Sequence, residues 1–205
     1  QSRSSAASDV YKRQHWRLKA YLAFFYICFF ASRVLSHEIS IDGKLDDPAW
    51  ISADEYTKYY ESLPFTLNEP KDFQKVLILE DEKGIYLGFI NKQDKETIRA
   101  NRHERDDEMA NADKAGLAID FDGDGLAAYA FTVSAGGSIA DGIYRNENEV
   151  NYDWDADWKS GVFIDQDYWY AEMFIPWSIA PMKAVNGDFR AVSYTHLTLP
   201  TIYSV

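Results

Sequence analysis

The sequence predicts an all-β protein, an antiparallel β-sandwich of the immunoglobulin or jelly-roll type. Short runs of the chain alternate apolar and polar residues with a period of two, as strands with one buried face do. Turn-forming Gly, Asp and Asn recur between these runs, and aromatic residues, which favour strands, make up 16% of the 205 residues. Strands joined by short turns form antiparallel sheets, and two such sheets packed together bury a core.

The first 36 residues precede the predicted domain. Residues 1–14 have no initiator methionine and resemble a leader of translated adapter or library sequence, whereas 15–36 has the pattern of a signal peptide. Arg17 and Lys19 supply its basic start, and residues 20–31 (AYLAFFYICFFA) supply an apolar run shorter than the roughly 20 residues of a membrane span. We therefore expect a secreted protein, located in the periplasm, in the outer membrane or outside the cell.

The domain itself is expected to span residues 37–190, followed by a non-native tail at 191–205. Its entry, residues 41–50 (IDGKLDDPAW), predicts a strand end, a tight turn at Asp42-Gly43 and a short helical turn that a proline begins. Trp50 is the residue that such a turn would anchor in the core.

Three pairs of alternating runs predict the strands of the sandwich. The hairpins are expected at 74–80 with 85–90, at 115–121 with 126–133, and at 161–165 with 168–176, and 138–143 continues the second of them. In the last run, one face is expected to carry Trp169, Ala171, Met173 and Ile175, and the other Tyr168, Tyr170, Glu172 and Phe174. The charged stretch 94–112 is a long connection, and long connections in compact domains are often functional.

Charge and cysteine content narrow the class of partner. Residues 37–190 carry 15 Lys and Arg against 32 Asp and Glu, a net charge of −17, compared with −12 for the whole chain. Nucleic-acid binding draws its affinity from basic patches, so we expect no nucleic-acid partner. The single cysteine, Cys28, lies in the signal-like segment, and no disulfide framework is therefore expected in the domain.

Several motifs occur in a fixed order along the domain. They are Ile41-Asp42-Gly43 with Trp50, the hairpin from Leu77 to Phe89, Arg105-Asp106-Asp107, Asp120-Phe-Asp-Gly-Asp124 before Ala128-Tyr-Ala-Phe131, Asp153-Trp154-Asp155-Ala156-Asp157-Trp158, and Tyr170-Ala-Glu172-Met-Phe-Ile-Pro176. In this order they resemble the family 9 carbohydrate-binding modules over about residues 39–189. The variant that they resemble more closely lies at the N-terminus of large bacterial envelope proteins.

The resemblance implies a β-sandwich that binds oligosaccharide or polysaccharide without catalysis and is associated with polysaccharide-degrading enzymes. It also implies that the chain is a fragment, continued by a missing C-terminal domain such as a membrane β-barrel. Members of the family can hold structural calcium.

Aromatic and polar side chains that suit sugar binding occur in two stretches. Trp154 and Trp158 lie four residues apart among aspartates, too polar a setting for a buried strand, and tryptophan rings can stack on the apolar face of a sugar. In the family that the chain resembles, tryptophans sandwich a terminal sugar. Arg105, Asp106 and Asp107 can donate to and accept from hydroxyl groups. Packing of either tryptophan in the core, and a surface ion-pair network, are the structural alternatives.

A calcium site is a further expectation. Asp120, Asp122 and Asp124 alternate along the chain, and Gly125 follows them, as at the start of a calcium-binding loop. The twelfth position is Phe131 rather than glutamate, so this is not an EF-hand. A plain Asp/Gly hairpin turn is the alternative.

Three other functions stay open at this stage. A hydrolase acting on O-glycosyl bonds would need two carboxylates roughly 5 to 10 Å apart, and Glu172 is the least surface-like acid. A haem domain would use axial ligands such as His103 or Met109 with Met173 or Met182, although their spacing fits no haem-attachment motif. The chain could also be a structural envelope domain that precedes an outer-membrane barrel.

Overall fold

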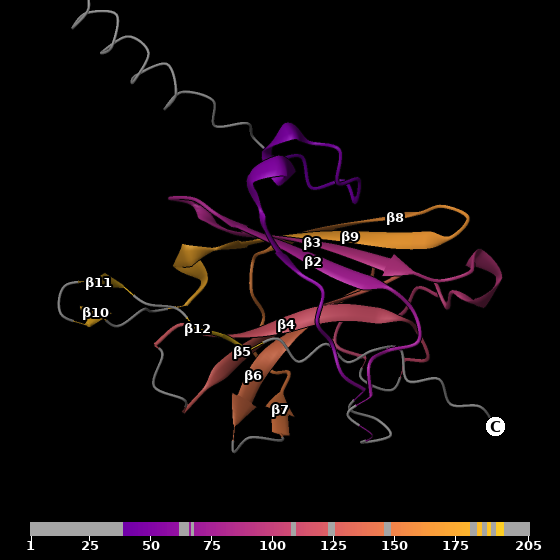
Figure 1. Cartoon of the computed structure of the whole chain (residues 1–205). Coiled ribbons are helices and arrows are strands. Elements are labelled where there is room, and N and C mark those ends of the chain that lie inside the picture. Colours follow the sequence, from indigo (N-terminus) through magenta and orange to yellow (C-terminus); the bar gives the residue numbers. More distant parts are fainter. Residues whose placement is uncertain are drawn as a thin grey trace, which may run out of the picture. The chain divides into compact units, whose positions relative to one another are not determined.

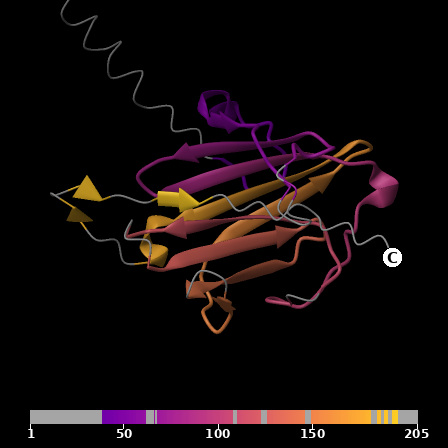
Figure 2. The same cartoon turned by 60° about the horizontal axis from the view of Figure 1, so that its bottom comes forward.

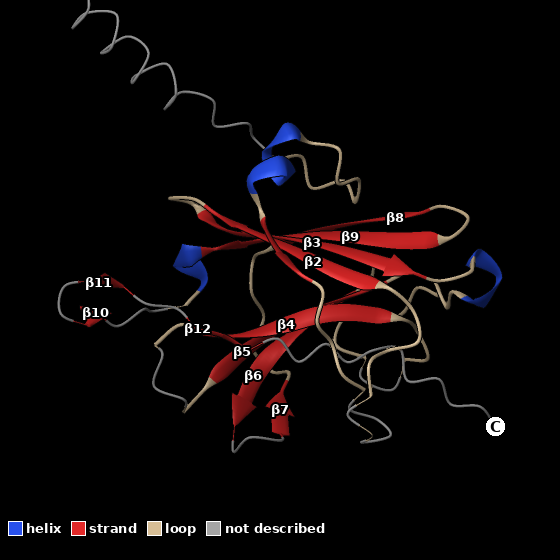
Figure 3. Cartoon of the chain, viewed as in Figure 1, coloured by secondary structure: helices blue, strands red, loops and turns tan. Residues whose placement is uncertain are grey.

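In the part of the chain that the structure describes, two antiparallel sheets of five strands each pack face to face (Figure 1). The computed structural model describes residues 39–61, 66, 68–107, 110–122, 126–145, 149–180, 184–185, 188–189 and 192–194. All of them belong to the unit Ile39–Val205. Strands dominate this unit, and its helical pieces are short turns (Figure 3). The predicted all-β sandwich is confirmed.

The first sheet has the strand order β1-β2-β3-β9-β8. Its strands are β1 (Asp54–Tyr56), β2 (Gln74–Glu80), β3 (Gly84–Lys92), β8 (Lys159–Ile164) and β9 (Tyr168–Pro176). The β2–β3 and β8–β9 hairpins are two of the three predicted from the sequence. The pairing of β3 with β9, from Gly84 opposite Pro176 to Lys92 opposite Tyr168, joins them across a long sequence separation.

The second sheet has the strand order β12-β4-β5-β6-β7, and Figure 2 shows it as a separate layer. Its strands are β4 (Lys114–Asp120), β5 (Ala128–Ser134), β6 (Ile139–Arg145), β7 (Glu149–Asn151) and β12 (Val192–Tyr194). The β4–β5 hairpin and its continuation into β6 are as predicted. Strand β12 pairs with β4 although it lies beyond residue 190, where the domain is predicted to end. That residues 191–205 are a non-native tail stays a prediction.

The remaining elements are short. They are a small separate pair, β10 (Ala184–Val185) with β11 (Asp188–Phe189), and the 3-10 helices η1 (Pro48–Ser52), η2 (Lys95–Thr97) and η3 (Trp177–Ile179). No helix among the described residues has the length and apolar character needed to cross a membrane. The predicted leader at 1–14 and signal peptide at 15–36 lie outside the described residues.

The core between the sheets follows the period-two alternation. Strand β9 turns four side chains inward, each at most 1% exposed, which are Trp169, Ala171, Met173 and Ile175. Strands β4 and β5 meet them with Leu117, Ile119, Phe131 and Val133. The predicted inward face of β9 is therefore confirmed, and apolar side chains from both sheets interdigitate there.

The outer face of the first sheet is partly covered by residues 39–53, the entry segment (indigo in Figure 1). Trp50 is 6% exposed and belongs to a second apolar cluster with Leu77 and Tyr86. Gly161 permits the close approach of the entry segment to β8, because a Cβ at this position would lie 2.6 Å from the backbone of Asp42. The predicted anchor role of Trp50 is confirmed, although its cluster lies outside the sandwich rather than between the sheets.

Glu172 attaches the entry segment to the sheet. Its side chain is fully buried on the outer face of β9 and accepts three N–H groups. Oε2 accepts from the backbone of Asp42 at 2.9 Å and of Gly43 at 2.8 Å, and Oε1 accepts from Trp50 Nε1 at 3.0 Å. Burial raises the pKa of this carboxyl, and the three donors oppose the shift.

We predict that Glu172→Ala lowers the free energy of unfolding by about 3 kcal/mol or more, because three N–H donors, two of them in buried hydrogen bonds, lose their acceptor at once. Glu172→Gln should fall between this variant and the wild type, since it keeps one acceptor oxygen. Denaturant unfolding measures both, with Glu82→Ala, an exposed turn residue, as the control that stays within about 0.5 kcal/mol. An unchanged unfolding midpoint for Glu172→Ala would contradict the role assigned to this carboxylate.

Candidate functional site

The two predicted tryptophans lie on the segment 152–158, the tryptophan segment, which runs from β7 in one sheet to β8 in the other. Trp158 is 6% exposed and its ring centroid lies 5.6 Å from that of Phe131 in the core. Trp154 is partly buried, with its ring centroid 4.9 Å from that of Tyr129 in an edge-on arrangement. The two rings therefore do not form a solvent-facing pair: Trp158 packs in the core, and Trp154 lies at its margin.

Arg105 joins the charged connection to the tryptophan segment. Its Nε lies 2.9 Å from Asp155 Oδ1 and 3.5 Å from Asp106 Oδ2. Its Nη2 donates to Asp141 Oδ1 and, at 3.2 Å, to the backbone oxygen of Ala156. Three carboxylates thus surround one guanidinium, whose fork of donors suits several acceptors at once.

Asp141 is the buried centre of this network, and sequence reasoning missed it. It lies on β6 directly opposite Phe131, so that its side chain points inward, and it is fully buried. Its second oxygen, Oδ2, accepts from the backbone N–H of Ala156 at 2.7 Å. The signal in the sequence was an acid between Ile139 and Ile143 at an inward position of an alternating strand.

Asp106 completes the network from the charged connection. It has a positive φ of 60°, a conformation that aspartate adopts more readily than most residues. Its Oδ1 accepts from the backbone N–H of Asp141 at 2.9 Å. Burial raises the pKa of Asp106, and the neighbouring charges of Asp141 and Asp155 add to the rise, while that backbone N–H and Arg105 oppose it. Asp107, the third predicted residue, is exposed, and its backbone oxygen accepts from Lys114 Nζ at 3.3 Å.

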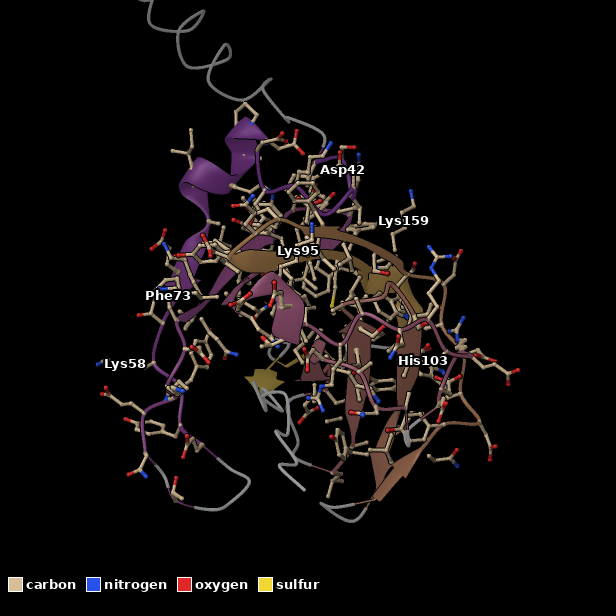
Figure 4. The ribbon with its side chains drawn as sticks, turned by 90° about the vertical axis from the view of Figure 1, so that its right-hand side faces the viewer. Asp42, Lys58, Phe73, Lys95, His103 and Lys159 are labelled. Atoms are coloured by element: carbon tan, nitrogen blue, oxygen red, sulfur yellow. The ribbon has the colours of Figure 1, made fainter. Side chains whose placement is uncertain are left out.

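His103 fastens the same connection to the turn between β5 and β6. Its backbone N–H donates to Ser138 Oγ at 2.9 Å, and the Ser138 hydroxyl donates back to its backbone oxygen at 2.8 Å. Figure 4 shows His103 on the side of the sandwich opposite Phe73 and Lys58. Two buried ring nitrogens, His103 Nε2 and Trp158 Nε1, meet no partner among the described residues.

The predicted calcium loop is only partly described. Asp120 ends β4 and is 1% exposed, and its Oδ1 accepts from the backbone N–H of Asp122 at 3.0 Å. Asp124 lies outside the described residues. Within the described residues no group of three or more His, Cys, Asp and Glu is arranged to hold a metal ion. Calcium at this turn stays a prediction.

Glu172 and Met173, which were considered for hydrolysis and for haem binding, hold the fold together. Glu172 is enclosed by its three donors, and Met173 is fully buried between the sheets. Met109 and Met182 lie outside the described residues.

The site as built is an aromatic edge bordered by fixed charges. Trp154 is partly exposed, and the side chains of Arg105 and Asp155 are 37% and 69% exposed. An apolar ring face beside a few oriented donors and acceptors is the composition of a small polar-ligand site.

Comparison with known proteins concerns the fold. No protein-family model matches the chain, and no curated protein matches it in sequence. The structure is similar to that of a family 9 carbohydrate binding module from Caldicellulosiruptor kristjanssonii in complex with cellotriose, with a TM-score of 0.51 and 12% identity over 71% of this chain. A family 9 module from the same organism in complex with glucose gives a TM-score of 0.47 at 12% identity, over 75% of this chain and 79% of that one. This chain spans 66% of the cellotriose-bound chain, just under two thirds. The first likeness confirms the predicted fold resemblance.

We predict that the two carboxylates paired with Arg105 differ in their effect on stability. Asp141→Ala should lower the free energy of unfolding by about 3 kcal/mol, because Arg105 and the Ala156 N–H lose a buried acceptor. Asp155→Ala should lower it by less than about 1 kcal/mol, because solvent screens that exposed pair. Denaturant unfolding of both variants measures the difference. Equal losses of stability would contradict the larger contribution assigned to the buried carboxylate of Asp141.

Proposed function

We propose that the chain is a non-catalytic carbohydrate-binding domain, and that the surface formed by Trp154, Arg105 and Asp155 receives the sugar. The observation that carries the proposal is that a partly exposed tryptophan directly precedes Asp155, one of the three carboxylates that fix Arg105. A pyranose ring has an apolar C–H face that can lie on an aromatic ring, and hydroxyls at its rim that need donors and acceptors.

The rigidity of this surface supports binding. Arg105 is held by Asp141, Asp106 and Asp155 before any ligand arrives, so that little side-chain entropy is lost when a hydroxyl approaches. Nε and Nη2 of Arg105 already have acceptors, however, so the donors that remain for a ligand are few. We therefore expect weak affinity, with a dissociation constant on the order of 10 µM to 1 mM.

Two further considerations favour a neutral sugar. The chain carries a net charge of −12, which disfavours polyanionic ligands. The solved family 9 module with a similar fold is in complex with cellotriose, which is uncharged. The fold likeness supports the class of ligand and leaves its identity to experiment.

The carboxylates at this surface support binding rather than hydrolysis. A glycosidase keeps one carboxyl group free to protonate the leaving oxygen and a second one free on the other side of the bond. Asp106, Asp141 and Asp155 instead share one arginine, and Asp141 also accepts from a backbone N–H. Release of reducing sugar from a polysaccharide by the purified chain would support the hydrolase alternative.

The wider setting is also part of the proposal. The signal-like segment 15–36 would direct the chain out of the cytoplasm, and the domain would then bring an appended enzyme or envelope protein to polysaccharide. A purely structural role in such a protein is the competing function, and the absence of binding to any sugar would favour it.

We predict that cellotriose binds the wild-type chain and that Trp154→Ala weakens binding at least tenfold, because the stacking surface is removed. Isothermal titration calorimetry measures both affinities. Tyr60→Ala removes an aromatic ring that is 59% exposed in the 57–73 connection and should bind as the wild type does. Thermal unfolding checks that Trp154→Ala remains folded, and Trp154→Phe provides a milder second variant. Equal affinity for all four proteins would exclude Trp154 from the site.

Calcium at the Asp120–Asp124 turn belongs to the same proposal, supported by the alternating aspartates and the burial of Asp120. Calcium should raise the melting temperature by a few degrees, and a chelator should reverse the rise. Asp122→Asn should reduce this response, whereas Asp153→Asn, an exposed aspartate outside the turn, should keep it. A melting temperature that is indifferent to calcium would leave the turn as a plain hairpin connection.

A further inference from the structure

Three aromatic rings form a row on the outer face of the first sheet, at the β8–β9 hairpin. Phe163 on β8 lies opposite Tyr170 on β9, with ring centroids 6.1 Å apart and planes 32° apart. Tyr168, two residues before Tyr170, continues the row at 6.0 Å and 26°. We call these three residues the aromatic row.

The aromatic row begins where the cover of this face ends. Residues 39–53 bury the outward side chains farther along the sheet, including Tyr86 and Phe174. Lys44 Nζ lies 6.0 Å from the centroid of the Phe163 ring and marks the margin of that cover. In Figure 1 the β8–β9 turn extends beyond the entry segment, and Figure 4 shows Asp42 of that segment on the outer side of the sheet.

Core packing does not account for the aromatic row. Outward positions on a solvated sheet face are normally polar, and one exposed aromatic ring needs no explanation, but a row of three does. Phe163 is 39% exposed, and the two tyrosines are partly exposed. None of the three belongs to either apolar cluster.

Polar groups border the row on both sides. Asp165 in the hairpin turn accepts from the backbone N–H of Asp167 at 3.0 Å and of Tyr168 at 3.1 Å, which fixes its carboxylate. It also hydrogen-bonds the Tyr170 side chain. Lys92 lies opposite Tyr168 on β3 and is exposed. The row thus has fixed acceptors at one end and ammonium donors beside it.

We propose that Phe163, Tyr168 and Tyr170 form an aromatic platform for an extended, uncharged polysaccharide chain, separate from the surface at Trp154. A row of exposed aromatic side chains on a sheet suits a polymer whose pyranoses present their apolar faces in series. Nucleic-acid bases also stack on aromatic rows, but the net charge of −12 repels their phosphates. The class of ligand rests on the proposed function, whereas the location does not.

The separation of the two surfaces follows from the strands that carry them. The aromatic row lies on the outer face of the first sheet, whereas Trp154 packs against Tyr129 and Phe131, which point inward from the second sheet. The Trp154 surface has a single ring and several charges, which suits one sugar unit. The aromatic row has three rings, which suits several consecutive units and a solid polysaccharide surface.

Adsorption of the 205-residue chain to microcrystalline cellulose, insoluble chitin and insoluble mannan tests the platform. The wild type should adsorb to at least one of them, and the double variant Phe163→Ala/Tyr168→Ala should adsorb at least tenfold more weakly. Tyr60→Ala, the matched exposed aromatic residue, should adsorb as the wild type does. Phe163→Trp keeps the ring and should retain adsorption, which separates loss of stacking from loss of folding.

Several outcomes would overturn the platform. They are no adsorption of the wild type to any of the three solids, equal adsorption of the double variant, and a self-associating wild type that the double variant makes monomeric without a change in adsorption. Sedimentation velocity measures the last of these. Failure of cellotriose to bind, together with adsorption that depends on Phe163, would remove the proposed role of Trp154 and leave the platform standing.

Discussion

The carboxylate of Glu172 is the interaction on which the outer half of the molecule depends. It gathers N–H groups from Asp42, Gly43 and Trp50, which are otherwise far from β9 in the sequence. Charge-assisted hydrogen bonds in a buried setting are stronger than those between neutral groups, and losing the acceptor would leave all three donors unsatisfied. Because this contact holds the entry segment on the sheet, it also decides which part of the outer face stays uncovered.

Buried carboxylates repeatedly bind segments that lack secondary structure to the sheets through hydrogen bonds. Asp141 holds Arg105 and the tryptophan segment, as Glu172 holds the entry segment. Asp113, fully buried before β4, accepts from Arg99 at 2.7 Å and from Gln93 at 2.8 Å. A carboxylate can accept several N–H groups at once, which makes it suited to gathering backbone from different directions. Part of the acidic excess of this chain is therefore structural and sits inside, not on the surface.

The sequence was most informative where local rules decide the structure. The hairpins, the inward face of β9 and the anchor role of Trp50 follow from alternation, turn residues and residue size. Sequence reasoning left open, or missed, the contacts that join distant segments. Trp158 follows aspartates that are exposed, yet its own ring packs against that of Phe131 in the core. Asp141 interrupts the apolar inward positions of β6, and its carboxylate pairs with Arg105, a partner 36 residues away. The alternation around Asp141 marks an unusual inward acid, but the sequence does not show the partner in either contact, because the partner lies on another element.

The two aromatic surfaces differ in what holds them in place, and this difference has chemical consequences. Around Trp154, charged groups are fixed by buried hydrogen bonds, so a ligand must match their directions. We therefore expect binding there to be specific although weak. The rings of the aromatic row are held by the pleat of two paired strands and, at Tyr170, by a hydrogen bond to Asp165. Stacking tolerates changes in the position of hydroxyls. In the roles that we propose, the first surface would distinguish one sugar from another, and the second would hold a polymer of a given shape. One sandwich can carry both because Glu172 closes only part of the outer face and Asp141 leaves Arg105 partly open.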